Sequence, residues 1–195
     1  MTAELRIIQQ GIYDGKEAAL ASLHRLFHRR LFSFSKTITR SAEDSEEIVE
    51  DIFVKLWSNR HQVMSIVNLQ VYLYVAIKNR SLNVLEKKSR ELVHASFDDL
   101  DIDLASLAPD PHKLLVTADM MKKMQVAIDS LPPRCKMIFR LIREDGLPYR
   151  EVAEILNISV NTIDVQMAIA VKKICQALHT ATGFNAIQFR QHLMR

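Results

Sequence analysis

Hydroxyl, amide and ammonium groups that can bind nucleic acid follow one another between residues 159 and 173. The hydroxyls and amides can exchange hydrogen bonds with phosphates and base edges, and an amide is best suited to adenine. The two lysines can neutralise backbone phosphates. These candidate contacts are Ser159, Asn161, Thr162, Gln166, Lys172 and Lys173. Asp164 stands among them and would repel phosphate unless it accepts a hydrogen bond from a cytosine amino group.

Two short helices joined by a tight turn, within residues 146–173, would position these groups. The first helix has an apolar face on which the small Ala153 lets the second helix cross close above it. Asn157 tolerates the left-handed conformation that ends the first helix, and Ser159 can cap the second by accepting from a free N–H. The pattern predicts a helix-turn-helix and therefore DNA binding, with an ordinary helical hairpin as the alternative.

A second candidate segment, residues 72–88, mixes aromatic, amide and basic side chains. An unstacked base needs a flat partner or an amide for its edge, and the phosphates need cations that gain from counterion release. The mixture therefore suits single-stranded DNA, with core packing as the alternative for both tyrosines. Its members are Tyr72, Tyr74, Lys78, Asn79, Arg80, Asn83, Lys87 and Lys88.

The other reactive side chains predict no catalytic, cofactor or metal site. His24 and His28 have the four-residue spacing of metal ligands on a helix, but no further ligands converge visibly in the sequence, so we expect a surface or interdomain pair. Cys135 and Cys175 lie on apolar helix faces without zinc-ligand spacing and are expected to be reduced core thiols. The sequence has no glycine-rich phosphate loop and no grouping of nucleophile with base, which argues against an enzyme.

The composition predicts an all-α chain. Its 195 residues include four glycines and five prolines, and stretches rich in Leu, Ala, Glu, Lys and Arg show helical periodicity. No apolar run reaches the ~18–20 residues that a membrane span needs, and the N-terminus lacks a signal pattern. We therefore expect a cytoplasmic protein that is not itself a membrane protein. The net charge of +3 suits a polyanionic partner without requiring one.

Periodicity and composition predict two small helical domains joined by an acidic linker. Helices are expected over 17–39, 43–57, 69–91, 114–131 and 134–144, before the helix-turn-helix. The linker is rich in aspartate, contains two prolines and has no sustained period. The expected divisions are an N-terminal domain at 1–95, the linker at 96–113, a four-helix C-terminal domain at 114–180 and a tail of unknown role at 181–195.

Three parts of the chain, in this order and spacing, resemble the extracytoplasmic-function (ECF) sigma factors, the two-domain specificity subunits of bacterial RNA polymerase. Residues 44–57, which read DSEEIVEDIFVKLW, look like the family's polymerase-docking helix. Residues 72–80, YLYVAIKNR, look like its promoter-opening segment. Residues 130–134, SLPPR, together with 146–149, GLPY, look like its C-terminal domain. The resemblance covers about residues 8–178.

The resemblance implies a function and a set of partners. A sigma factor binds core polymerase, recognises promoter elements near −35 and −10 and starts to open the duplex. Asn79 matches an amide that the family uses to hold an extruded −10 base, and the helix-turn-helix would read the −35 element. Many relatives are held inactive by an anti-sigma factor, often membrane-tethered. The docking helix would meet the coiled coil of the β′ clamp through Glu46, Glu47, Glu50, Asp51 and Lys55.

The chain also departs from the family, and these departures leave two rivals open. Glu50 and Asp51 stand where the family usually has Gln and Glu. Asp164, Gln166 and Ile169 occupy positions where many members carry Arg or Lys. We therefore expect weak autonomous DNA affinity, with specificity arising when polymerase tethers both domains to one promoter. The rivals are a free-standing helix-turn-helix regulator and a helical interaction adaptor that has lost DNA reading.

Overall fold

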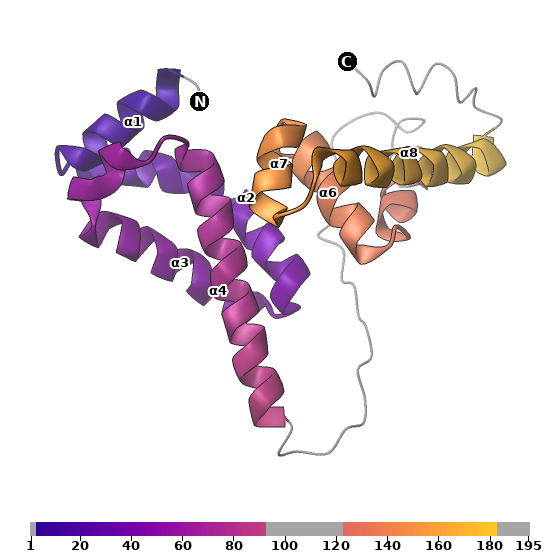
Figure 1. The fold of residues 1–195 in the computed structure, drawn as a ribbon, viewed down its shortest axis with the longest axis horizontal. Helices are drawn as coiled ribbons and strands as arrows, with labels where there is room; N and C mark the ends of the chain where they lie inside the picture. The colour runs from indigo at the N-terminus through magenta and orange to yellow at the C-terminus, as the bar shows by residue number, and fades with distance from the viewer. Residues whose placement is uncertain (1–2, 93–122, 183–195) are drawn as a thin grey trace. The chain divides into compact units, whose positions relative to one another are not determined.

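The computed structural model describes residues 3–92 and 123–182, which are helical and divide between two compact units (Figure 1). The first unit contains helices α1 to α4, and the second contains α6 and α8. No strand occurs within the two described ranges, and the all-α prediction is confirmed. In chain order the elements are α1 (Ala3–Tyr13), α2 (Glu17–Thr39), α3 (Ala42–Ser58), the 3-10 helix η1 (Arg60–Ser65), α4 (Leu69–Leu92), α6 (Pro133–Arg143), α7 (Tyr149–Leu156) and α8 (Val160–Thr182).

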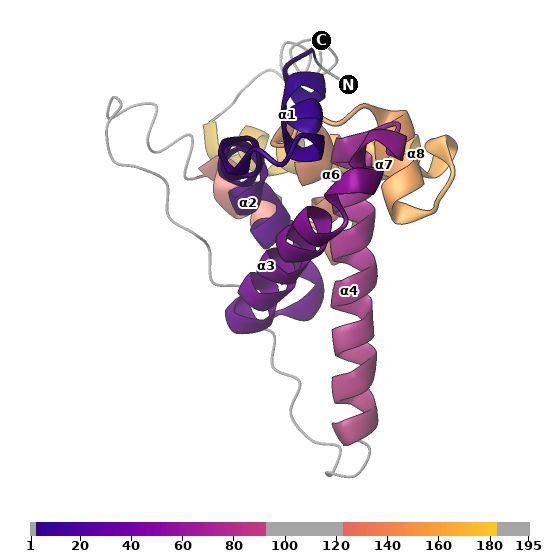
Figure 2. The same cartoon turned by 90° about the vertical axis from the view of Figure 1, so that its left-hand side faces the viewer.

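Apolar residues at helical spacing build the core of the first unit. α2 buries Leu23, Phe27 and Leu31, one turn apart, and so presents a continuous apolar stripe. α3 turns Ile48 and Ile52 inward, and α4 packs against both α2 and α3 (Figures 1 and 2). The predicted helices 17–39, 43–57 and 69–91 thus correspond to α2, α3 and α4.

α1 and η1 are elements that the sequence pattern does not predict. α1 has helical spacing in Leu5, Ile8 and Ile12, which are buried, but Gly11 interrupts it and costs a helix about 1 kcal/mol relative to alanine. The glycine has a packing reason. A Cβ at this position would lie 2.7 Å from the Cβ of Ala19, so Gly11 lets α1 and α2 approach closely.

A buried amide fastens η1 to α1. Gln9 is 3% exposed, and its Nε2 donates hydrogen bonds to the carbonyl oxygens of Val63, at 2.6 Å, and Ile66, at 2.9 Å. Both carbonyls lie in the last turn of η1 or directly after it. η1 is a short 3-10 helix, and the hydrogen bonds within such helices have poorer geometry than those of an α-helix. The position of η1 therefore depends on this side chain.

We expect Gln9→Leu to destabilise the first unit by about 1–3 kcal/mol, because the carbonyls of Val63 and Ile66 lose the Gln9 amide while the side-chain volume is nearly kept; the Val63 carbonyl retains the N–H of Ile66 at 3.1 Å. Thermal unfolding of the full chain measures the change, at about 4–8 °C per kcal/mol for a unit of this size. Gln10→Leu is the matched control, since Gln10 is exposed and, within the described part of the chain, its side chain bonds only to Asp14, four residues further on. Equal melting temperatures for the two variants would contradict the role given to Gln9.

The predicted helix-turn-helix is present in α7 and α8. α7 ends at Leu156, and Asn157, the next residue, adopts the left-handed conformation with φ of 54°. The N–H of Ile158 donates to the carbonyl of Ala153 at 3.0 Å. Ser159 caps α8 by accepting from the N–H of Thr162 at 3.1 Å. Both turn residues thus act as the sequence predicts.

The predicted helix limits that fall on described residues agree with the structure to within two residues, whereas residues 114–122 of the predicted helix 114–131 lie outside the described residues. α6 begins at Pro133, one residue before the predicted start, because proline fits the first turn of a helix. α8 continues to Thr182, past the predicted domain end at 180. The linker 96–113 and nearly all of the tail 181–195 lie outside the described residues.

An ion cluster joins α6 to the helical stretch at residues 123–129. The carboxylate of Asp129 lies 3.2 Å from Lys136 Nζ and 3.3 Å from Arg140, and it accepts a hydrogen bond from Gln125 at 3.0 Å. The Lys136 side chain is 7% exposed, so its charge depends on this partner. None of the described helices is long and apolar enough to cross a membrane.

Candidate functional site

The outer face of α3 carries the charges that the docking prediction names. The helix turns its apolar stripe inward and leaves Glu46, Glu47, Glu50 and Lys55 exposed, with Asp51 half-buried. Ser41 caps the helix by accepting from the N–H of Asp44 at 3.2 Å, and acidic residues in the first turn suit the helix dipole. These five residues therefore share one rigid helix surface.

Ion pairs connect α3 to α4. Asp51 lies 3.2 Å from Arg80, and Asp44 lies 2.6 Å from Lys88. The hydrogen bond from Lys88, followed by that involving Ser41, lowers the pKa of Asp44 below its ordinary value. A carboxyl group whose pKa is lowered by folding stabilises the folded state at pH values above its pKa in the unfolded chain. That contribution is lost as the pH falls through the lowered pKa of the folded state. Arg80 and Lys88, both predicted to bind DNA, thus also position α3.

Val54 is an apolar residue on the charged face of α3 that the sequence analysis missed. Its side chain is 62% exposed, whereas the neighbouring Ile52 and Phe53 are buried. Val54 follows Glu47 by seven residues and Glu50 by four, so all three lie on one side of the helix. The sequence contained a signal for this residue, because Val54 is apolar but falls outside the helical spacing of the residues that α3 turns inward.

The predicted DNA-binding segment lies on α4. The helical repeat of α4 places its two tyrosines on nearly opposite sides of the helix. Tyr72 is 42% exposed, whereas Tyr74 is fully buried, with its ring 5.2 Å from that of Phe34. Residues two apart on a helix point about 200° apart, so both rings cannot face solvent. The prediction that Tyr74 contacts DNA is wrong, and the core-packing alternative holds for it.

The remaining predicted residues of α4 are accessible to different degrees. Lys78 and Arg80 are half-buried. Asn79, Asn83, Lys87 and Lys88 are exposed. The exposed amides of Asn79 and Asn83 can therefore reach bases or phosphates, whereas Lys78 donates to the carbonyl of Ile155 at 2.7 Å and Arg80 and Lys88 help to hold α3.

A pocket of about 270 Å³ opens beside Tyr72, where α3 ends, η1 runs and α4 begins. Its polar groups come from Asn59, Gln62 and Ser65, three residues that the sequence analysis did not single out. The sequence feature that could have pointed to them is the polar stretch between the two apolar helices α3 and α4. Asn79 is not among the lining residues and lies about 10 Å further along α4 than Tyr72. The complete lining is Leu56, Asn59, Gln62, Val63, Ser65, Ile66 and Tyr72.

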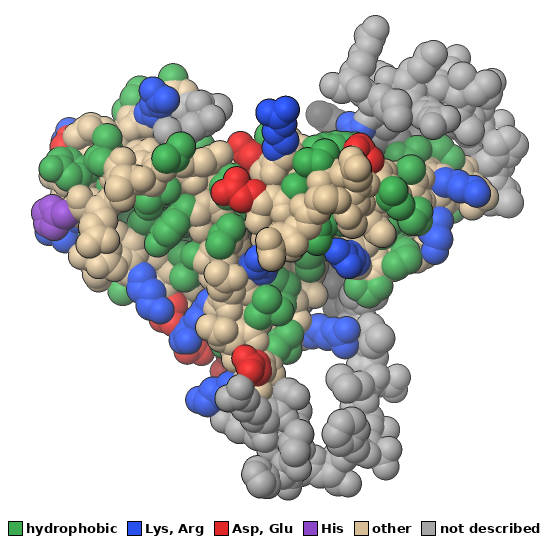
Figure 3. Space-filling view, viewed as in Figure 1, with side chains coloured by type: hydrophobic (Ala, Val, Ile, Leu, Met, Phe, Trp, Pro, Cys, Tyr) green, Lys and Arg blue, Asp and Glu red, His purple; other side chains and the backbone are tan. Residues whose placement is uncertain are grey.

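The predicted contacts of the helix-turn-helix lie along α8. Ser159 and Thr162 are 2.8 Å apart through their hydroxyls at its start, and Asn161 is exposed beside them. Gln166 is half-buried. Lys172 and Lys173 are exposed in the C-terminal half, where Figure 3 shows basic side chains.

Val165 and Ile169 are exposed on α8 by 57% and 37%. They follow Asn161 by four and eight residues, so they continue the line of its exposed side. The sequence analysis did not count Val165 as a candidate contact. The sequence feature that could have pointed to Val165 is an apolar residue that stands at helical spacing among polar candidate contacts.

Cys135 and Cys175 are not joined in a disulfide. Cys135 is buried and its Sγ donates to the carbonyl of Gln166 at 3.2 Å, while Cys175 is half-buried. Burial raises the pKa of the Cys135 thiol, an effect that Lys173 partly opposes. The prediction of a core thiol is therefore confirmed for Cys135.

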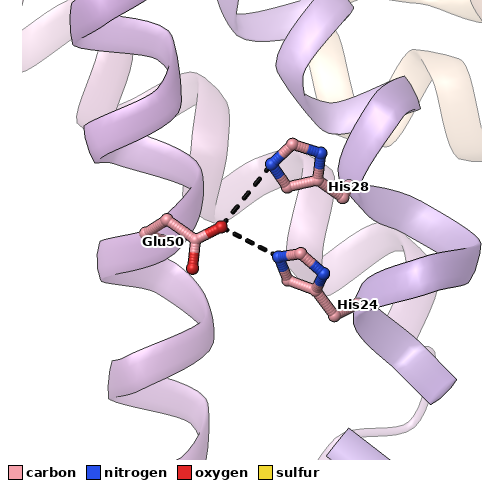
Figure 4. A group of neighbouring side chains, drawn as sticks. All are labelled: His24, His28 and Glu50. Atoms are coloured by element: carbon pink, nitrogen blue, oxygen red, sulfur yellow. Dashed lines mark hydrogen bonds and ion pairs between the residues drawn. The ribbon is translucent and has the colours of Figure 1, made fainter. Parts of the chain in front are cut away.

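His24 and His28 lie on α2 opposite the charged face of α3. Figure 4 shows both rings turned toward Glu50, whose Oε1 is 2.8 Å from Nε2 of His24 and 3.5 Å from Nε2 of His28. Glu46 Oε1 is 3.0 Å from Nε2 of His28. The sequence shows the histidine spacing but not these carboxylates, which α3 brings from more than fifteen residues away.

Comparison with known proteins places a family model on each unit. The Sigma-70 region 2 model matches residues 23–91, and the Sigma-70 region 4 model matches residues 121–174, together more than half of the chain. The ECF RNA polymerase sigma factor SigE of Mycolicibacterium smegmatis is 22% identical over 152 residues. That match covers 76% of this chain and 58% of the relative, so the chain spans less than two thirds of the relative's length.

Two solved structures share the fold. The sigma factor RpoE from Bartonella quintana, in complex with the anti-sigma factor NepR, has a TM-score of 0.60 at 20% identity, with 81% of this chain and 95% of that chain covered. CnrH, in complex with the cytosolic domain of CnrY, has a TM-score of 0.53 at 17% identity, with 91% and 97% covered. The region 2 model covers α2 to α4, and the region 4 model covers α6, α7 and most of α8. The two regions occur in this order, and the match to an ECF sigma factor covers three quarters of this chain. The chain therefore belongs to the ECF-type sigma factors.

Proposed function

We propose that this chain binds core RNA polymerase and directs promoter-specific initiation of transcription, without catalysing a reaction itself. The observation that carries the proposal is the order of the region 2 and region 4 matches on two separate helical units. The N-terminal domain, residues 1–95, docks and opens the −10 element. The C-terminal domain, residues 114–180, reads the −35 element. Residues 96–113 link them, and the protein works in the bacterial cytoplasm.

The α3 face is the proposed docking surface for the β′ clamp coiled coil. Glu46, Glu47, Glu50, Asp51 and Lys55 supply its charges, which set orientation and the rate of association. The exposed Val54 supplies an apolar contact within them. Desolvating such a residue at the centre of a charged surface adds affinity that the charges alone do not supply.

The pocket beside Tyr72 is the proposed receptor for an unstacked base of the −10 element. Tyr72 offers an aromatic surface, and the amide of Gln62 can pair with a base edge. Asn79, exposed further along α4, would then pair with another nucleotide of the same strand, while Lys78, Asn83 and the basic residues that follow hold its phosphates.

We expect Gln62→Ala to reduce the number of open promoter complexes roughly tenfold, because a base edge loses a hydrogen bond worth about 1–3 kcal/mol. Permanganate footprinting on duplex and pre-melted promoters measures this loss. The defect should persist on the pre-melted template, since the pocket and not the melting energy is changed. Gln10→Ala on α1 is the control, and Asn79→Ala tests the neighbouring contact. A Gln62→Ala variant that opens both templates like the parent protein would contradict the pocket assignment.

The proposed −35 reader is the exposed side of α8. Asn161 and Gln166 pair with base edges, and Ser159 and Thr162 reach base edges or phosphates at the start of the helix. Lys172 and Lys173 neutralise phosphates. Val165 adds a contact suited to a thymine methyl group, which offers specificity where arginine is absent.

An anti-sigma factor is a further proposed partner. Both solved structures that share the fold were determined with an anti-sigma factor or with the cytosolic domain of a partner protein. An inhibitor that covers both the α3 face and the α4 segment would block polymerase and promoter at once.

Reconstitution with core polymerase tests the proposed function. Core enzyme is mixed with the purified full chain and a library of promoter fragments, and specific transcripts are sequenced. We expect transcripts that start at one class of promoter and that disappear when the chain is omitted. A chain that binds DNA specifically without polymerase but starts no synthesis would be a free-standing regulator. A chain that does neither would be an adaptor, and either result would overturn the proposal.

A further inference from the structure

His24, His28 and Glu50 bring three potential metal ligands together across α2 and α3. Their ligand atoms all lie within 4.8 Å of one another. Figure 4 shows both imidazole rings pointing from α2 toward one carboxylate oxygen on α3. Imidazole nitrogen and carboxylate oxygen are ligands that zinc prefers in proteins.

Glu46 lies on the same helix face, beside these three residues, and is a candidate fourth ligand. Its Oε1 is 3.0 Å from His28 Nε2, and it precedes Glu50 by four residues, as His24 precedes His28. Pairs four residues apart occupy one side of a helix, so two ligands from α2 face two from α3. Zinc–ligand distances near 2.1 Å place the ligand atoms of a tetrahedral site about 3.4 Å apart. The observed separations of 2.8, 3.0 and 3.5 Å lie around that value.

The scaffold holds the two rings in place. The His24 ring packs 4.8 Å from the ring of Phe53, a buried residue of α3, and 4.6 Å from the ring of His28. The His28 ring stacks on Phe32 at 6.3 Å. The histidine side chains are 36% and 27% exposed, so they are partly ordered by packing and still open to an ion from solvent. Such a site needs little rearrangement to bind metal.

We propose that His24, His28, Glu46 and Glu50 bind one divalent transition-metal ion of the zinc class across α2 and α3. Two neutral imidazoles and two carboxylates balance the charge of a divalent ion. Binding replaces the hydrogen-bonded histidine–glutamate pairs and releases any proton that they share. Hard cations such as Mg²⁺ prefer oxygen ligands and retain water, so they do not compete effectively for the imidazoles.

The site occupies part of the proposed docking surface. A bound ion would neutralise the charges of Glu46 and Glu50 and draw both carboxylates toward α2, away from a partner. Metal would therefore weaken binding to core polymerase. This consequence rests on the proposed function, whereas metal binding itself does not.

Calorimetric titration of the chelator-treated full chain tests the metal site without polymerase. We expect Zn²⁺ to bind at one ion per chain and Mg²⁺ at the same concentration to give no signal. His24→Gln combined with His28→Gln should weaken Zn²⁺ binding at least tenfold, and so should Glu50→Gln, which is the milder change. His61→Gln is the matched control, because His61 is an exposed histidine of the same unit outside the cluster. Cys175→Ser removes a half-buried thiol as an alternative ligand and should leave binding unchanged.

A second readout shows whether the ion sits among nitrogen and oxygen ligands. Co²⁺ bound by the parent chain should give visible absorption typical of a four- or five-coordinate site, and Zn²⁺ should displace it. Zinc affinity that is equal in the parent, the double histidine variant and Glu50→Gln, with all three folded by circular dichroism, would overturn the proposal. Failure of transcription in the reconstituted system would overturn the proposed function and would leave this result unaffected.

Discussion

Replacing Asp129 by alanine is expected to destabilise the second unit by about 2–4 kcal/mol. Lys136, whose side chain is 7% exposed, would keep its charge in a place where no carboxylate of residues 3–92 or 123–182 forms an ion pair with it. Breaking one side of a buried ion pair costs about 3–5 kcal/mol in general, and the figure here is lower because the Asp129 side chain keeps 28% exposure. Arg140 also loses a partner at 3.3 Å, although Glu144, at 3.6 Å, remains.

Hydrogen–deuterium exchange on the full chain measures this loss, because the amides of α6 and α8 report the opening of their own unit. Asp164→Ala is the control, since Asp164 is an exposed aspartate on α8 and its removal should change stability by less than about 0.5 kcal/mol. Adding Lys136→Met to Asp129→Ala should recover part of the loss, because an apolar side chain tolerates the buried position. If the amides of α6 and α8 are protected from exchange equally in the Asp129→Ala and Asp164→Ala variants, the ion cluster contributes nothing to stability.

Reversing the charged face of α3 is expected to weaken binding to core polymerase about a hundredfold while the fold survives. The variant combines Glu47→Lys with Val54→Lys. Both side chains are exposed, and among the described residues Glu47 makes no hydrogen bond or ion pair, so neither change disturbs a stabilising interaction. Glu46 and Glu50, which contact the histidines, are left unchanged. A hundredfold weakening corresponds to about 2.8 kcal/mol, which is within the range expected when a central apolar side chain is replaced and a neighbouring charge is reversed.

The matched control for the docking variant combines Glu4→Lys with Ile7→Lys on α1. Glu4 is exposed and Ile7 is 74% exposed, so the net charge changes by the same amount on another surface of the same unit. Competition binding to fluorescently labelled core enzyme, at low and raised salt, gives the two affinities, and circular dichroism gives the two melting temperatures. Equal losses of affinity in both variants would show a general effect of net charge. That result would remove α3 as the docking surface.

Local chemistry explains which predictions from the sequence agree with the structure. The left-handed Asn157 and the capping Ser159 depend only on residues within a few positions, so the turn of the helix-turn-helix is readable from sequence. The same holds for the limits of α2, α3 and α4, which follow apolar spacing and end at breaks. The sequence also shows that Tyr72 and Tyr74 point to nearly opposite sides of their helix, because residues two apart are about 200° apart, but the structure decided which of them is buried.

Features that join distant residues required the tertiary structure. Gln9 contacts carbonyl groups more than fifty residues away, so no local pattern shows why a buried amide stands in an apolar helix or where η1 lies. The pocket beside Tyr72 exists because the end of α3, η1 and the start of α4 meet around it. The sequence alone determined α2 to α4, the turn of the helix-turn-helix and the family resemblance, since these depend on neighbouring residues or on motifs in order. Only helix packing decided that Glu50 meets His24 and His28, because the angle and register of α2 against α3 are set by the buried side chains of both.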